Sequence, residues 1–282
     1  MNPLFRYLFN CNKKKIAVFY FGFITISLLL LFNMMGLSKV TNQLTKDITL
    51  GIFIVIIGST AFLLLLIALP SFNKILKNSM IRYTAISGKK YIYANLFFFT
   101  LMFILLLVIG LIFLYYFSQS AYGGKVVGDF QQEFHKLYEY GFIQHILSVF
   151  LWGIDFMSIL VSCYFIMVIT KLIPIKSSLS KMILSIIFFA LFLTLQTLVL
   201  DVLSKLEKYV ITIKSTGFID KNGFIETSLY PSEGFTILDV CFTCLFIIVL
   251  TAITGRIIDK KLEIQSFHFK SRMYLGGKNE NN

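Results

Sequence analysis

Charged residues are scarce in this sequence: Asp, Glu, Lys and Arg together make up 14% of its 282 residues, whereas 57% are hydrophobic. A soluble domain of this length needs far more charge to cover its surface, so the composition excludes an ordinary soluble protein. The mean hydropathy of +0.81 agrees. The expected class is therefore an integral membrane protein.

Several chemical motifs are missing as well. A phosphate-binding loop needs Gly-x4-Gly-Lys-Ser/Thr, and the Gly-Lys pairs at Gly88, Gly124 and Gly277 lack both the upstream Gly and the following hydroxyl residue. The three histidines are scattered along the chain, and no Ser/His/Asp or Cys/His hydrolase pattern is present. We expect no enzyme activity in this chain, no catalytic residue, no bound metal and no bound cofactor.

Only four cysteines occur: Cys11, Cys163, Cys241 and Cys244. The pair Cys241-x-x-Cys244 has the spacing of a redox or metal motif. It lies inside an apolar run, however, with no His or further Cys near it in the sequence. Small buried residues on a helix explain the pair better, and no structural disulfide is predicted.

What the chain does contain is long apolar runs. Crossing a hydrocarbon core as a helix takes roughly 20 apolar residues. Six runs meet this length, and they predict one all-α transmembrane domain over residues 1–282, with a polar cytoplasmic tail at 259–282. The expected spans are Ile16–Leu37, Ile48–Leu69, Ala94–Phe117, Ile146–Thr170, Met182–Leu203 and Phe235–Ile258.

The distribution of cations predicts the orientation. The segments 1–15, 70–93, 171–181 and 256–282 hold 18 of the 26 Lys and Arg residues but only three of the 14 acids. Because Lys and Arg accumulate on the cytoplasmic side, these segments and both termini are expected in the cytoplasm. The net charge of +12 is then explained by cations that meet anionic headgroups, and no nucleic-acid partner is expected.

The N-terminal segment also fits a retained membrane anchor. Ile16–Leu37 is too long for a signal-peptide core and has no small-x-small cleavage site after it. In front of it, Leu4, Phe5, Leu8 and Phe9 recur at helical spacing. Met1–Asn12 is therefore expected to form an amphipathic helix in the membrane interface, with a disordered apolar terminus as the alternative.

Two external segments carry signals of local structure. From Asp129 onward, apolar residues at helical spacing predict a short helix on the outer face. The segment Tyr209–Ser228 is rich in Val, Ile, Thr and Phe around the turn sequence DKNG, which predicts a small extracellular β-hairpin.

The segment between spans 2 and 3 is basic and contains no acid. Between Pro70 and Phe99 it carries five cations, and its first part has helical periodicity. One face is formed by Phe72, Ile75, Leu76, Ser79, Met80 and Tyr83. We expect an amphipathic cytoplasmic helix over Ser71–Tyr83 that starts at Pro70 and ends near Ser87-Gly88. It either anchors the loop or docks a partner.

The end of this segment resembles a known element. Thr84–Phe99, TAISGKKYIYANLFFF, is similar to the end of the first cytoplasmic loop in permease subunits of bacterial ABC-2-type exporters, where a helical loop ends in an (I/V)-S-(basic) element before span 3. Ile86, Ser87, Lys89 and Lys90 stand at the matching positions. The six-span layout is similar too. The acids that the family usually carries in this loop are absent here.

The resemblance implies a function and partners. In that family the loop helix is the coupling helix that docks into the ATPase subunit, so Phe72, Ile75, Leu76, Lys77, Met80, Arg82 and Tyr83 become the expected ATPase-docking residues. The implied assembly is two such chains, identical or similar, with two ATPase subunits that hold ATP and Mg²⁺, in the bacterial cell membrane. By analogy alone, an amphipathic or antimicrobial-type peptide is the expected substrate.

Three acids fall in or near the spans. Asp155 is about ten residues into span 4, beside Trp152 and Ser158, whereas Asp201 and Asp239 are near outer ends. A carboxylate at depth costs at least about 2.5 kcal/mol on insertion scales, so it needs a partner or a watery cavity. Asp155 is expected either to line the substrate pathway or to hydrogen-bond to Ser, Gln196 or backbone. For Asp201 and Asp239 water access at the interface is the simpler interpretation.

Two other function classes stay open. An ion-coupled secondary transporter would need internal repeats and polar groups in broken spans, and spans 1 to 3 contain no charge. A membrane sensor or assembly factor without transport activity would share the composition. Copurification with an ATPase distinguishes both from a permease.

Overall fold

The computed structural model describes residues 2–37, 43–77, 87–122, 142–173, 177–206 and 237–276. Nearly all of them belong to six helices, and the described part of the chain contains no strand, which confirms the all-α class. The helices are α1 (Asn2–Leu37), α2 (Gln43–Lys77), α4 (Gly88–Tyr122), α6 (Phe142–Leu172), α7 (Ser178–Leu206) and α8 (Ile237–Gly276).

All six helices are long and apolar enough to cross a membrane, which confirms the prediction of a multi-pass membrane protein. Helices suit this environment because each one satisfies its own backbone hydrogen bonds where no water is present. The apolar stretches within them are Leu4–Gly36, Ile48–Lys74, Gly88–Phe117, Val149–Leu172, Leu179–Leu203 and Leu238–Lys260.

Several hydroxyl side chains within the spans are satisfied by their own helix, Ser27 and Thr254 among them. Ser27 donates to the carbonyl of Phe23 at 2.8 Å, and Thr254 donates to that of Leu250 at 2.7 Å. Each bond reaches back four residues to the previous turn, which is the usual way for Ser and Thr to sit inside a helix. These residues therefore need no polar partner on another helix.

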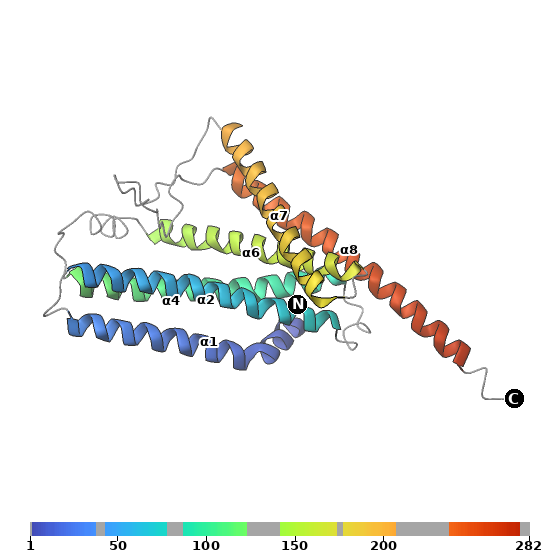
Figure 1. Cartoon of the computed structure of the whole chain (residues 1–282), viewed down its shortest axis with the longest axis horizontal. Helices are drawn as coiled ribbons and strands as arrows, with labels where there is room; N and C mark the ends of the chain where they lie inside the picture. Colours follow the sequence, from blue (N-terminus) through green and yellow to red (C-terminus); the bar gives the residue numbers. More distant parts are fainter. Residues whose placement is uncertain are drawn as a thin grey trace.

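Helix α4 is the centre of the bundle. It packs against α1, α2, α6 and α8, whereas α7 packs mainly against α6 and α8 and slants away from α1 and α2 (Figure 1). Phe98 and Phe99 of α4 are fully buried, and Phe103 stacks on Phe156 of α6 with ring centroids 4.2 Å apart. In lipid such close packing, rather than exclusion of water, holds helices together.

A second buried cluster joins α1, α2 and α4 nearer the other end of these helices. It is built on Phe23, Phe53 and Phe117, one from each helix, and the rings of Phe53 and Phe117 are 4.6 Å apart. Aromatic pairs at such distances add about 0.5–1.5 kcal/mol beyond burial. The three helices therefore form one packed unit over their length.

The N-terminal segment is helical, as its periodicity predicts, but it is continuous with the first span. Helix α1 runs without a break from Asn2 and bends toward its N-terminal end (Figure 1). Leu8 is buried in the core, and the ring of Phe5 lies 5.2 Å from that of Phe98. Its apolar face therefore packs against the protein, and a position in the membrane interface stays a prediction.

The prediction of a helix start at Pro70 is wrong. Pro70 lies inside α2, which continues to Lys77. Proline removes one backbone hydrogen bond in a helix interior, but neighbouring helices in a membrane bundle can hold the helix together. Here Ser71 and Phe72, which follow the proline, are both buried against other helices. Residues 71–77 are thus the end of α2.

Most of the predicted C-terminal tail is helical, because α8 continues as far as Gly276. Both ends of the described chain lie at the same end of the bundle (Figure 1), as an even number of crossings requires. The expected outer helix after Asp129 and the expected hairpin at Tyr209–Ser228 lie outside the described residues.

Candidate functional site

The candidate site is the end of the bundle where the basic segment leaves α2 and enters α4. The last turns of α2 are fixed to α6 by two contacts. Phe72 is fully buried and stacks on Tyr164 with ring centroids 4.1 Å apart, and the ammonium of Lys171 donates to the side-chain carbonyl of Asn73. Tyr164 in turn donates its hydroxyl proton to Asn95 of α4. The end of α2 is therefore connected to α6 and, through α6, to α4.

The start of α4 is held by α8. The backbone carbonyl of Ser87 accepts the N–H groups of Lys90 and Tyr91 at 3.0 and 3.4 Å, so Ser87 forms the first turn of the helix. The N–H of Gly88 donates to Oδ1 of Asp259 on α8 at 2.6 Å. A carboxylate is favourable here because the N-terminal end of a helix carries partial positive charge.

Two glycines allow α4 and α8 to approach this closely. A Cβ atom on Gly88 would lie 2.9 Å from the carbonyl oxygen of Gly255, and one on Gly255 would lie 3.0 Å from the backbone nitrogen of Lys89. Both distances are to backbone atoms, which cannot rotate away. The glycine in the Ser-Gly-Lys-Lys element of the basic segment therefore has a packing role against the last span.

The predicted docking residues fall into three groups. Phe72 is fully buried in the bundle, where its ring stacks on Tyr164 of α6. Its side chain therefore has no surface left for contact with another subunit. Ile75, Leu76 and Lys77 are in the last turns of α2, but their side chains are outside the described part of the structure. A further three lie outside the described residues: Met80, Arg82 and Tyr83.

The predicted pathway residues lie on α6, α7 and α8. Asp155 is exposed on α6, Trp152 is half-buried beside it, and Ser158 one turn on is buried. The amide of Gln196 on α7 donates to the hydroxyl of Ser158 at 3.1 Å. Gln196, one of the expected partners of Asp155, is thus bonded to Ser158 instead.

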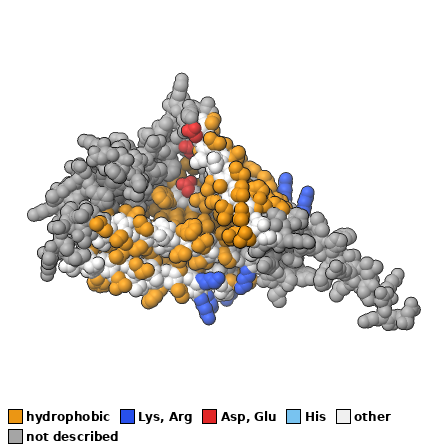
Figure 2. Space-filling view, viewed as in Figure 1, with side chains coloured by type: hydrophobic (Ala, Val, Ile, Leu, Met, Phe, Trp, Pro, Cys, Tyr) orange, Lys and Arg blue, Asp and Glu red, His pale blue; other side chains and the backbone are white. Residues whose placement is uncertain are grey.

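The other two acids are near the ends of their helices, Asp201 exposed on α7 and Asp239 half-buried at the start of α8. On the face shown in Figure 2, acidic side chains lie beside α7, and the Lys and Arg side chains are set apart from them. The assignment of the two ends to the two sides of the membrane stays a prediction.

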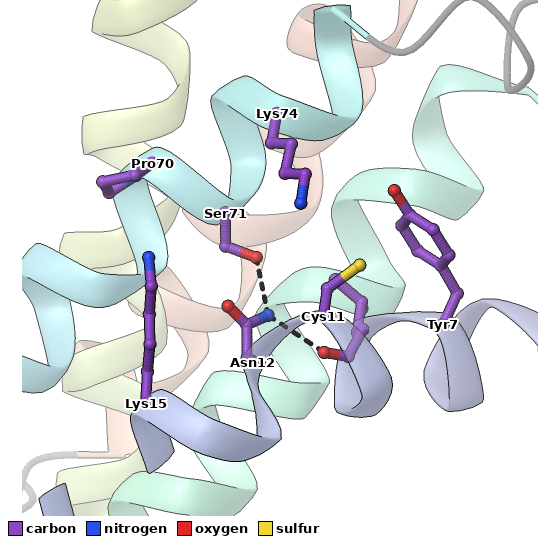
Figure 3. Close-up of a pocket in the computed structure, with 8 residues that line it drawn as sticks. Tyr7, Cys11, Asn12, Lys15, Pro70, Ser71 and Lys74 are labelled. Carbon is purple, nitrogen blue, oxygen red and sulfur yellow. Dashed lines mark hydrogen bonds between the residues drawn. The ribbon is translucent and has the colours of Figure 1, made fainter. Parts of the chain in front are cut away.

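A cavity of about 170 Å³ between α1 and α2, lined by both polar and apolar residues, was not predicted from the sequence. At its base, Nδ2 of Asn12 donates to Oγ of Ser71 at 2.9 Å and to the carbonyl of Leu8 at 3.0 Å (Figure 3). The sequence carried one signal of this cavity: Asn12 lies four residues from both Leu8 and Ile16, so the spacing places a polar amide on the apolar face of the helix. In the structure all three side chains are buried.

Comparison of the chain with protein-family models, with curated protein sequences and with solved structures gives no match.

Proposed function

We propose that this chain is the membrane-spanning permease subunit of an ATP-driven exporter of the ABC-2 type. Six membrane-spanning helices without a phosphate-binding loop are compatible with a permease whose ATP hydrolysis takes place on a separate subunit. The chain would work as a pair, either two copies or two similar permeases, with an ATPase bound to each on the cytoplasmic side.

The observation that carries the proposal is how firmly the basic segment is held at both ends. Its start is fixed to α6 through Phe72 and Asn73, and its end is fixed to α8 through Gly88. A segment held in this way would transmit a displacement caused by an ATPase to α6 and α8 as well as to α2 and α4, which a loosely tethered loop cannot do. Packed side chains, hydrogen bonds and helices of this kind can carry energetic coupling between two sites.

The docking residues in this proposal are the ATPase-docking residues expected from the sequence, without the buried Phe72. With α2 continuing to Lys77, the docking surface begins in its last turns with Ile75, Leu76 and Lys77, and extends through Met80, Arg82 and Tyr83. The positive charge of the segment favours an acidic cleft on the ATPase.

The substrate pathway would run beside α6, where Asp155 is exposed next to Trp152. An exposed carboxylate at this depth is costly against lipid but acceptable in a watery cavity between two permeases. Helix α7 packs mainly on α6 and α8 and exposes apolar side chains along its length, so it has room to pack against a second permease. A cationic amphipathic peptide is the substrate that an acidic, aromatic pathway fits.

The deciding experiment is a pull-down of the tagged chain, in detergent, from its native host. We expect an ATP-binding subunit to copurify with the wild type and to be lost with Arg82→Glu. The matched control is Arg6→Glu, the same charge reversal at an exposed position on α1. Absence of an ATP-binding subunit from the wild-type sample would overturn the proposal and direct attention to Asp155 and ion-coupled transport.

A further inference from the structure

The cavity between α1 and α2 is a second site, away from the proposed pathway, and its α2 residues Pro70, Ser71 and Lys74 precede the docking residues that begin at Ile75. Its lining combines the hydroxyl groups of Tyr7 and Ser71, the thiol of Cys11, the amide of Asn12 and the ammonium groups of Lys15 and Lys74 (Figure 3). All eight lining residues are described, and none of them is acidic. Together with Leu8 and Pro70, these residues give the cavity both apolar and polar walls and a positive charge.

The base of this cavity is preorganised. Asn12 is 4% exposed and Ser71 is 8% exposed, and the hydrogen bond between them fixes both side chains. Because Oγ of Ser71 accepts the proton of Asn12, its own hydroxyl hydrogen remains to donate. A hydroxyl donor that is held by a buried amide costs little to reorganise when an anion binds.

The two lysines come from different helices and border the same space. Lys15 belongs to α1 and Lys74 to α2, and in Figure 3 both side chains extend alongside Ser71 and Asn12. Two ammonium groups around hydroxyl donors make a suitable site for a phosphate group. A volume of about 170 Å³ also exceeds what one water molecule needs and leaves room for a phosphate.

The position of the cavity indicates which phosphate reaches it. Lys74 is the last residue of the second apolar stretch, so the cavity is at the level of the headgroups. Below it on α1, Val18 and Phe21 follow Lys15 at i+3 and i+6 and are 73% and 74% exposed. An acyl chain can lie along these side chains while its headgroup is in the cavity, whereas a free phosphate would make no use of them.

We propose that this cavity binds the phosphate of an anionic phospholipid from the cytoplasmic leaflet. The basic flanks place it on the side where anionic lipids concentrate. The bound lipid bridges α1 and α2 at the point where Pro70 interrupts the backbone bonds of α2. The proposal does not rest on the exporter function, since it concerns only the residues of α1 and α2.

The test measures lipid binding by native mass spectrometry of the purified full chain with added phosphatidylglycerol or phosphatidylcholine. We expect the wild type to retain one phosphatidylglycerol in preference to phosphatidylcholine. Lys15→Gln with Lys74→Gln should weaken that binding about tenfold or more. Lys14→Gln with Lys90→Gln removes the same charge at exposed positions outside the cavity and should change binding less than about twofold.

Two results would overturn the proposal. Equal loss of phosphatidylglycerol from both double variants would mean that the basic face attracts lipid without a site. Binding of inorganic phosphate that displaces the lipid at equal concentration would mean that the site takes a free anion. Circular dichroism and the melting temperature in phosphatidylcholine check that the variants fold.

A second measurement uses the wild type and so does not depend on a variant's folding. Cys11 lines the cavity, and its rate of modification by a water-soluble maleimide can be followed by peptide mass spectrometry. We expect phosphatidylglycerol to slow the modification of Cys11 severalfold and phosphatidylcholine to leave it unchanged. Equal rates in the two lipids would contradict occupation of the cavity.

Discussion

Phe72 shows how a helical face read from the sequence can be assigned to the wrong neighbour. Its spacing with Ile75 and Leu76 places it on an apolar stripe, and a stripe beyond a proline resembles a separate interfacial helix. Periodicity specifies only that a face is buried, not what buries it. In the structure the ring stacks on Tyr164, so the position contributes to stability of the bundle rather than to docking.

Replacing Phe72 with Ala should therefore destabilise the chain itself. Phe→Ala in a buried site costs about 3–5 kcal/mol in soluble proteins, and we expect the lower part of this range because lipid solvates apolar surface better than water does. The melting temperature in detergent measures the effect. Phe62→Ala, at an exposed position on the same helix, is the control and should change stability by less than about 0.5 kcal/mol. A melting temperature equal to the wild type would contradict the stacking role.

Asp155 allows a test between a structural and a functional role. Because Gln196 bonds to Ser158 and Asp155 is exposed, Asp155→Asn should leave the melting temperature unchanged or raise it slightly. Gln196→Ala, which removes the bond between α6 and α7, should lower stability by about 0.6 kcal/mol. Transport by Asp155→Asn should fall in a reconstituted assay. A stability loss above about 1.5 kcal/mol for Asp155→Asn would assign it a structural role instead.

Among the elements, the six spans could be predicted from the sequence, whereas the ends of the helices and the contacts between them could not. Apolar runs determine spans because lipid admits only helices with satisfied backbones, so each expected run falls in one described helix, apart from the first two residues of the last run. The bend of α1, the continuation past Pro70 and the Asn12–Ser71 bond depend on contacts between distant residues. A single sequence does not contain those contacts.

The crossing of α4 and α8 depends on glycine at both contact points. In Gly255→Ala the new methyl group would lie about 3 Å from the backbone of Lys89, so the helices must separate. We expect a loss of about 1–3 kcal/mol, measured by thermal unfolding in detergent. Gly58→Ala on α2 is the matched control, since nothing lies within 4 Å of its Cβ position, and it should be neutral or stabilising by up to about 1 kcal/mol. Equal melting temperatures for the two variants would contradict the close crossing.

Asp259 contributes to the same junction through a hydrogen bond. Asp259→Ala leaves the N–H of Gly88 without its acceptor and should cost about 0.5–2 kcal/mol, as for loss of a helix cap. Asp259→Asn keeps an acceptor oxygen and should retain most of the stability. If the junction transmits force from an ATPase, Asp259→Ala should also lower the coupling of ATP hydrolysis to transport. Equal stability of the Ala and Asn variants would contradict the capping role.

For the molecule as a whole, the two proposals share one requirement, which is the orientation of the bundle. An ATPase and an anionic lipid surface would both be on the cytoplasmic side, and the proposed docking segment and the proposed lipid cavity are both at the basic end of the helices. Neither proposal holds if this end faces outward. The orientation rests on the excess of Lys and Arg in alternate loops, a rule that governs insertion rather than packing.

Reporter fusions test this orientation directly. Green fluorescent protein fused after Asn282 should fluoresce, because it folds in the cytoplasm, and alkaline phosphatase inserted after Gly123 should be active, because it requires the outer side. The expected pattern follows from 18 of 26 cations in the segments assigned to the cytoplasm. Transferring this excess of cations should invert the orientation of the chain. Lys→Gln changes at residues 13–15, with Lys added within residues 38–42, should therefore lower fluorescence of the C-terminal fusion. The reverse pattern in the wild type would place Lys15, Lys74 and the basic segment outside the cell, and would remove the physical basis of both the docking site and the lipid site.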